Sequence, residues 1–95
     1  MANYELMAII NPSLSEEDRN ASLDNLKKIL EKYNAKIEKE DIWGEKKLAY
    51  KINGLSTGFY ILFDLDLDWT KIKDISTEIN LDRNIYRYMF VKKED

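Results

Sequence analysis

The sequence predicts an α+β fold in which four strands form one antiparallel sheet and two helices cover one of its faces. Three observations carry this prediction: apolar runs of strand length, two segments with apolar residues every three or four positions, and turn residues between them. The resulting order is strand, helix, strand, strand, helix, strand. Right-handed crossovers turn that order into the ferredoxin-like β-α-β-β-α-β arrangement, with the first and third strands in the middle.

The first strand is predicted at residues 4–10, where every position except Glu5 is apolar. Pro12 ends it, because proline cannot donate to a strand ladder. Ser15 is a candidate helix N-cap, followed by three acidic residues that the helix dipole favours. Asn34 can adopt the left-handed conformation that ends a helix. The apolar stripe of this helix is expected to consist of Leu23, Leu26, Leu30 and Tyr33.

The second strand is predicted at residues 36–52, where apolar and polar residues alternate around Gly44, a candidate bulge. The Asn-Gly pair at 53–54 is a turn signal, and Gly58 is expected to close a connection of about five residues. The third strand, at residues 59–65, is apolar on both faces, as a central strand requires.

The second helix is predicted directly after Asp68, which is a candidate cap. The last strand is predicted at residues 85–91. The apolar stripe of this helix is expected to consist of Trp69, Ile72, Ile75 and Ile79.

Composition narrows the function classes. Residues 1–95 contain no linker rich in Pro, Gly or Ser and are expected to form one domain. Cysteine and histidine are absent, which removes thiolate metal sites, disulfides, and the commonest general base and zinc ligand. No run approaches the roughly 20 apolar residues that span a bilayer. We expect a cytoplasmic protein without metal, cofactor, membrane or small-molecule substrate.

The charge balance argues against a general nucleic-acid binder. The net charge is −3, from 15 basic and 18 acidic residues. Proteins that bind nucleic acid through charge alone are usually strongly basic.

Two helices can cover only one face of the predicted sheet, so its two faces should differ. One parity is expected to face the helices: Leu6, Ala8, Ile10, Leu48, Tyr50, Ile52, Phe59, Ile61, Phe63, Tyr88 and Phe90. The opposite parity carries an uncovered apolar group: Met7, Ile9, Tyr60, Leu62, Met89 and Val91. It also carries five charges: Glu5, Lys47, Lys51, Asp64 and Arg87. Contiguous apolar patches mark interaction sites, so we predict a partner surface, with self-association as the alternative.

Residues 43–52, Trp-Gly-Glu-Lys-Lys-Leu-Ala-Tyr-Lys-Ile, resemble the second-strand signature of the bacterial small-subunit ribosomal protein S-six (S6) family. That signature has a glycine, two basic residues, Leu-Ala-Tyr and an isoleucine. The resemblance extends along the whole chain to Tyr4, Glu5, Asn11, Pro12, Arg83, Asn84, Arg87, Tyr88, Met89 and Lys92. The chain departs from the family at Ala2-Asn3, where members often have basic residues, and at Lys51, where they often have proline.

The resemblance implies a structural, non-enzymatic role in the small ribosomal subunit. Members pair with ribosomal protein S-eighteen and bind the central domain of small-subunit ribosomal RNA as a heterodimer. A basic partner would account for the negative charge, and it could use either the open face or the edge of the second strand. Matching positions imply RNA contacts at Lys46, Lys47, Arg83, Arg87 and Lys92. Trp43 joins the candidate partner surface or stacks on a base. Tyr50 could also stack on a base, although its parity favours the core, and Lys93 is expected to lie on a solvated strand face.

The sequence contains no motif for a metal site or for catalysis. Asp64, Asp66 and Asp68 alternate, but a calcium loop needs Gly and Glu where Trp69 and Ile75 stand. The glycines form no phosphate-binding motif, and the serines lack a histidine partner.

Two rival functions share this order of elements. Residues 57–63 weakly resemble the third-strand signature of an RNA-recognition motif, with three mismatches. A self-associating regulatory domain would need a small-molecule pocket, which no motif identifies.

Overall fold

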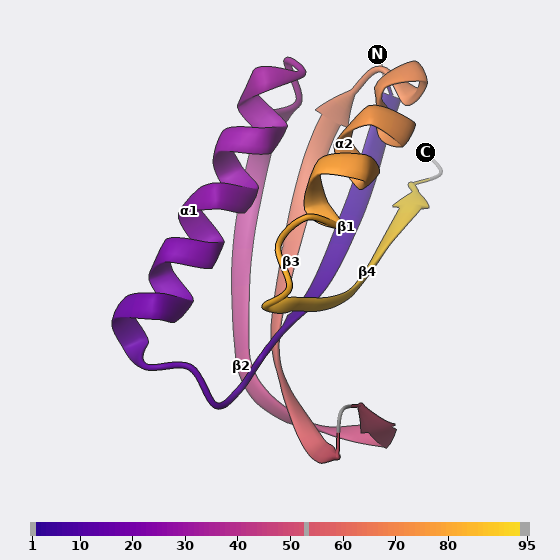
Figure 1. Cartoon of the computed structure of the whole chain (residues 1–95). Coiled ribbons are helices and arrows are strands. Elements are labelled where there is room, and N and C mark those ends of the chain that lie inside the picture. The colour runs from indigo at the N-terminus through magenta and orange to yellow at the C-terminus, as the bar shows by residue number, and fades with distance from the viewer. Residues whose placement is uncertain (1, 53, 94–95) are drawn as a thin grey trace.

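The structure, a computed structural model, describes residues 2–52 and 54–93. Its sheet has the order β2-β3-β1-β4 and is antiparallel throughout. Helices α1 and α2 lie on one face of this sheet, and no helix among the described residues covers the other, which we call the open face (Figure 1). The predicted α+β, ferredoxin-like fold is confirmed. The elements are β1 (Ala2–Ile10), α1 (Glu16–Lys32), β2 (Lys36–Ile52), β3 (Leu55–Leu67), the 3-10 turn η1 (Trp69–Lys71), α2 (Ile72–Ile79) and β4 (Ile85–Lys92).

Helix α1 follows the sequence prediction closely. Ser15 is its N-cap, and the Ser15 hydroxyl accepts a hydrogen bond from the backbone N–H of Asp18 at 3.1 Å. Asn34 has a φ of 61°, which is the left-handed conformation expected after the helix. The predicted stripe faces the sheet, with Leu26 and Leu30 fully buried, and Ile29 joins it.

The core lies between the helices and the two central strands. Leu6 and Ala8 of β1 face the helices beside Phe63 and Ile61, their partners on β3, and all four are completely buried. Ile75 of α2 is also completely buried. Burial of this kind is the main favourable contribution to folding.

The two helices are also joined at their surface by a polar contact. Glu78 of α2 accepts a hydrogen bond from the Tyr33 hydroxyl and lies 3.0 Å from the ammonium of Lys32. The hydrogen bond from Tyr33, followed by that from Lys32, lowers the pKa of Glu78 below its ordinary value. The same contacts with Glu78 raise the pKa values of Tyr33 and Lys32.

The predicted position of Trp69 on an apolar helix stripe is wrong. Asp68 accepts hydrogen bonds from the backbone N–H and the hydroxyl of Thr70, at 3.0 and 2.9 Å, and these bonds lower its pKa. Because the Asp68 side chain bonds to Thr70, only two residues later, it caps a tight 3-10 turn, and α2 begins only at Ile72. Trp69 lies in that turn and is 68% exposed, whereas Ile75 and Ile79 occupy the stripe as predicted.

The hairpin between β2 and β3 is longer than the sequence indicated. β3 begins at Leu55 rather than Phe59, so the predicted five-residue connection ending at Gly58 is wrong. Gly54 has a φ of 78°, as a tight turn requires, whereas its predicted partner Asn53 lies outside the described residues. The paired strands extend beyond the rest of the sheet (Figure 1).

Bulges bend β2 and change which way its side chains point. The predicted bulge at Gly44 is confirmed, because Ile42 pairs with Ile61 and Gly44 with Tyr60, which leaves Trp43 extra. Gly44 has a φ of 81°, which favours glycine. A larger irregularity follows, in which residues 48–51 of β2 stand against the single residue Ser56.

The bulge at Gly44 overturns part of the predicted helix-facing set. Before it, Ile42 pairs with the helix-facing Ile61; after it, Lys46 pairs with Gly58, where a Cβ would point at Ile9 on the open face. Tyr50 is 58% exposed and lies on the open face, beside Ile9 and Arg87. Leu48 also approaches that face, since its Cδ2 atom is 3.3 Å from the position a Cβ would take at Gly58. Inserted residues reverse the alternation that the prediction of a helix-facing Leu48 and Tyr50 assumed.

Candidate interface on the open face of the sheet

The open face is built from rows of side chains that neighbour one another across strands β3, β1 and β4. The pairing register places three residues in each row, in the order of those strands. The rows are Tyr60, Ile9 and Arg87; Leu62, Met7 and Met89; and Asp64, Glu5 and Val91. The face is therefore aromatic and apolar toward the hairpin and charged toward the other end of the sheet.

The six apolar residues predicted for this face all lie on it. Met89 and Val91 are 55% and 45% exposed, and the other four are partly exposed. Trp43 extends the group onto β2, where its ring stacks on Tyr60 with the centroids 6.5 Å apart and the planes 11° apart. The indole N–H of Trp43 donates to Asp41 at 3.2 Å, so the ring has a fixed orientation while remaining 43% exposed.

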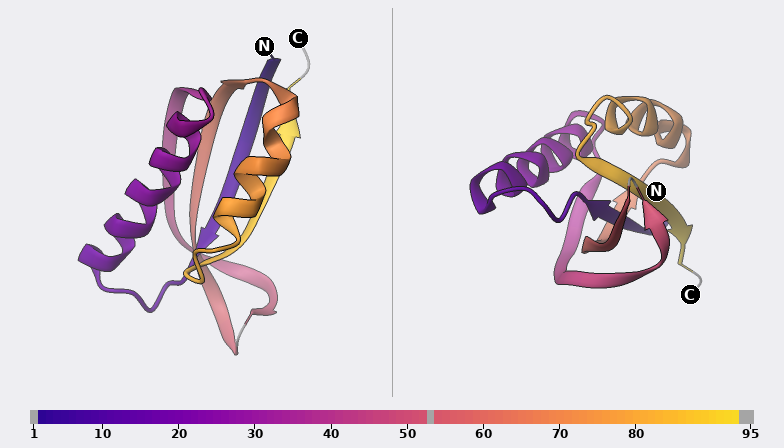
Figure 2. Two further views of the ribbon diagram at one scale, coloured as in Figure 1. Left: turned by 45° about the horizontal axis from the view of Figure 1, so that its top comes forward. Right: turned by 60° about the horizontal axis from the view of Figure 1, so that its bottom comes forward.

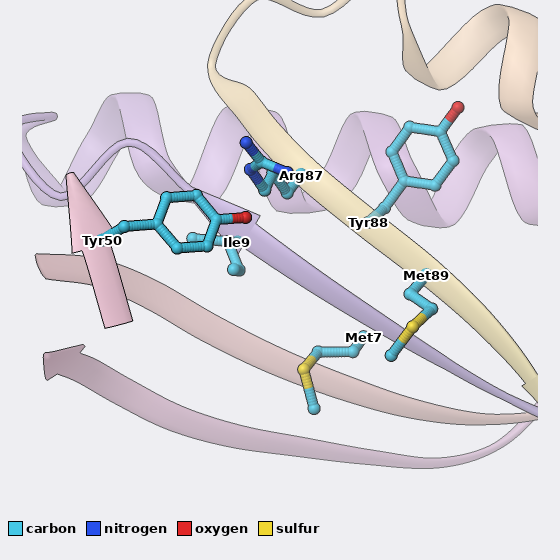
Figure 3. Close-up of a pocket in the computed structure, with 6 residues that line it drawn as sticks. All are labelled: Met7, Ile9, Tyr50, Arg87, Tyr88 and Met89. Atoms are coloured by element: carbon cyan, nitrogen blue, oxygen red, sulfur yellow. The ribbon is translucent and has the colours of Figure 1, made fainter. Parts of the chain in front are cut away.

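A shallow pocket of about 260 Å³ lies where the hairpin approaches β4. Tyr50 and Arg87 form one side of it, with the guanidinium carbon 4.9 Å from the centre of the tyrosine ring. Figure 3 shows these two side chains together over Ile9, with the two methionines side by side further along the sheet. The pocket is lined by Met7, Ile9, Tyr50, Arg87, Tyr88 and Met89.

The charged end of the open face is balanced within the protein. Glu5 and Asp64 are direct cross-strand neighbours, which brings two carboxylates together. Lys93 offsets this repulsion, because its ammonium lies 3.4 Å from a carboxylate oxygen of Asp64. Lys93 is exposed, as the sequence predicted, and it also pairs with Asp64 at the surface.

The structure separates the five cations that the resemblance implies as RNA contacts. Lys46 and Lys47 are exposed on the hairpin, and Arg87 is on the open face next to it. The predicted open-face parity of Lys47 is wrong, because Lys46 pairs with Gly58 on that face and Lys47 pairs with Thr57, which points the other way. Arg83 lies in the loop before β4 and lines a shallow depression with α1 residues on the helix-covered side. Lys92 ends β4, roughly 17 Å along the strand from Arg87.

The sequence favoured the core over a surface position for Tyr50, although a signal against one-to-one pairing was present. The predicted second strand had 17 positions and the predicted third strand only seven, so one-to-one pairing between them was impossible. Either a longer third strand or bulges in the second had to follow, and the structure has both.

Comparison with known proteins decides the family. The sequence model of the family described as "Ribosomal protein S6" matches residues 3–92. This chain belongs to the ribosomal protein S6 family. The identification made from residues 43–52 is thereby confirmed, and with it a place in the small ribosomal subunit.

Similar proteins agree over nearly the full length. The small ribosomal subunit protein bS6 of Fusobacterium nucleatum is 37% identical over 94 residues, covering 99% of this chain and all of that protein. The bS6 protein of Saccharopolyspora erythraea is 32% identical and matches 98% of this chain and 79% of its own length. The crystal structure of 30S ribosomal protein S6 from Thermotoga maritima superposes with a TM-score of 0.90 at 28% identity, covering 97% and 87% of the two chains.

No helix among the described residues is long and apolar enough to cross a bilayer.

Proposed function

We propose that this S6-family chain binds the central domain of small-subunit ribosomal RNA as a heterodimer with ribosomal protein S-eighteen, in an architectural role without catalysis. The observation that carries the proposal is the open face. It combines an exposed apolar patch with Arg87 and the lysine-bearing hairpin at one end. A protein partner and an RNA strand can therefore use neighbouring parts of one rigid surface.

The protein partner is assigned to the apolar patch. Met89 and Val91 on β4 keep about half of their surface exposed, and Trp43 and Tyr60 present stacked rings on β2 and β3 of the same face. Aromatic residues and methionine are enriched at protein interfaces relative to the rest of a protein surface. The proposed partner surface consists of Met7, Ile9, Trp43, Tyr60, Leu62, Met89 and Val91.

The RNA is assigned to the cations nearest this patch. Lys46, Lys47 and Arg87 can attract phosphates, and a guanidinium can also bind a phosphate in bidentate fashion. With a net charge of −3 this chain repels RNA at long range, so we expect tight binding only when a basic partner is present. Arg83 and Lys92 lie apart from these three cations, so we propose that they contribute less to RNA binding.

The proposal is tested by retention of a central-domain RNA fragment at physiological salt, with this protein alone, S-eighteen alone, and both together. Specific retention by the mixture, beyond that of either protein alone, is expected. Tight binding of single-stranded RNA by this chain alone would favour the RNA-recognition-motif function instead. No effect of this chain in any mixture would contradict the proposal, and self-association measured by sedimentation would then favour a regulatory domain.

A further inference from the structure

Tyr50 and Arg87 meet although their strands lie at opposite edges of the sheet. The order β2-β3-β1-β4 puts two strands between them. In a flat sheet, strands three places apart are about 14 Å apart, because neighbours are spaced by 4.7–4.9 Å. The guanidinium carbon of Arg87 nevertheless lies 4.9 Å from the centre of the Tyr50 ring.

The hairpin closes that gap by curling across the open face. The right-hand view in Figure 2 shows the last part of β2 beside β4. The curl follows from the irregularity at residues 48–51, which adds length to β2 opposite Ser56. Gly58 permits the close approach, because a Cβ there would collide with the side chain of Ile9 and crowd Leu48.

We infer that Tyr50 is a positioning residue, whose contact with Arg87 holds the curled hairpin and so sets the place of Lys46 and Lys47 relative to Arg87. This inference rests on the proposed RNA-binding function. It assigns Tyr50 a role in the site without requiring that Tyr50 touch the RNA.

The chemistry of the contact suits this role. A tyrosine ring attracts a guanidinium through its face, whereas the N–H donors of arginine lie in the guanidinium plane. Stacking therefore restricts the rotamers of Arg87 while leaving donors for a phosphate. The same contact links the hairpin to β4, since no pairing of β2 with β4 exists among the described residues. The position of the lysine-bearing hairpin relative to Arg87 therefore depends on this contact.

The test compares Tyr50→Leu, which removes the ring, with Tyr50→Phe, which keeps it. In the isolated protein, NMR should show the side-chain protons of Arg87 shifted by the ring current in wild type and Tyr50→Phe but not in Tyr50→Leu. Amide exchange in residues 46–51 should be faster in Tyr50→Leu only. A melting temperature near that of wild type for both variants separates this effect from unfolding.

RNA binding by each variant paired with S-eighteen completes the test. Tyr50→Leu should weaken affinity about threefold to tenfold, and Tyr50→Phe should leave it unchanged. Lys47→Ala should cost less affinity in the Tyr50→Leu background than in wild type, because the hairpin is already displaced.

Several results would overturn the inference. Wild-type affinity in Tyr50→Leu, equal losses in Tyr50→Leu and Tyr50→Phe, or a Lys47→Ala effect independent of position 50 would each do so. A wild-type mixture that fails to bind RNA would instead remove the proposed function.

Discussion

The two faces of the central strands differ in how completely their side chains are used within the protein. Leu6, Ala8 and Ile10 of β1 are completely buried against the helices. Met7 and Ile9 alternate with them on the same strand and remain partly exposed. A period of two therefore divides one strand into a set that stabilises the fold and a set available for recognition.

Side-chain contacts also differ between the helix-covered face and the open face. On the helix-covered face, the guanidinium of Arg19 lies 4.3 Å from the centre of the Phe59 ring, and Glu78 joins the two helices. On the open face, Met89 and Val91 end in solvent. Substitutions on the first face should act mainly on stability, and substitutions on the second mainly on binding.

The largest expected effect is on stability, from Phe63→Ala on the helix-covered face. Phe63 is completely buried, and its truncation should lower the free energy of unfolding by about 3–5 kcal/mol. The neighbouring change Leu62→Ala, on the open face, should cost only about 1 kcal/mol, because Leu62 is already partly in water. Urea unfolding followed by circular dichroism measures both, and equal losses would contradict the division between faces.

The next effect is on protein binding, from Met89→Asp. A carboxylate in the middle of a desolvated contact should weaken binding of S-eighteen by about tenfold to a hundredfold. Met89→Leu is the matched control and should bind within about threefold of wild type. Isothermal titration measures the affinities. If Met89→Asp binds normally while both variants keep their melting temperatures, the partner must use the edge of β2.

A smaller effect is expected on RNA binding by the heterodimer, from Arg87→Ala combined with Lys47→Ala. Loss of two phosphate contacts should reduce the slope of log affinity against log salt by about two and weaken binding by about tenfold. Arg83→Ala should change the slope less, because Arg83 lies on the helix-covered side. Filter binding across a salt series gives the slopes. Equal slopes for all variants would exclude the hairpin cations from the site.

Sequence patterns predicted the regular part of this architecture and failed at inserted residues. In β1, β3 and β4 the open-face set has the predicted parity from Met7 to Val91, because alternation holds as long as pairing is one-to-one. In β2 the bulge at Gly44 reversed the parity of the residues that follow it, including Leu48 and Tyr50. The predicted position of Trp69 on the helix stripe was wrong for a local reason, because the Asp68 cap begins a 3-10 turn instead of an α-helix.

The candidate site, like the fold, could be predicted from the sequence only where the strands pair one-to-one. The apolar residues of the open face could be named from alternation alone. The proximity of Tyr50 and Arg87 could not, because it depends on how far β2 curls, which is a property of the pairing between strands.

The smallest expected effect belongs to the polar contact that joins the helices on the covered side, and it depends on pH. Hydrogen bonds from Tyr33 and Lys32 lower the pKa of Glu78 in the folded protein, so the unfolded chain binds a proton more readily at this position. The stability that Glu78 contributes is therefore present above the ordinary carboxyl pKa of about 4.3 and is lost as the pH falls through the lowered pKa. Glu78→Gln should lower the urea midpoint slightly at pH 7, and the difference from wild type should shrink progressively between pH 5 and pH 3. Glu31→Gln, at an exposed position of α1, is the control and should show no such convergence. A difference between wild type and Glu78→Gln that stays constant with pH would mean that the charge of Glu78 does not matter, and that its contact with Tyr33 acts only as a neutral hydrogen bond.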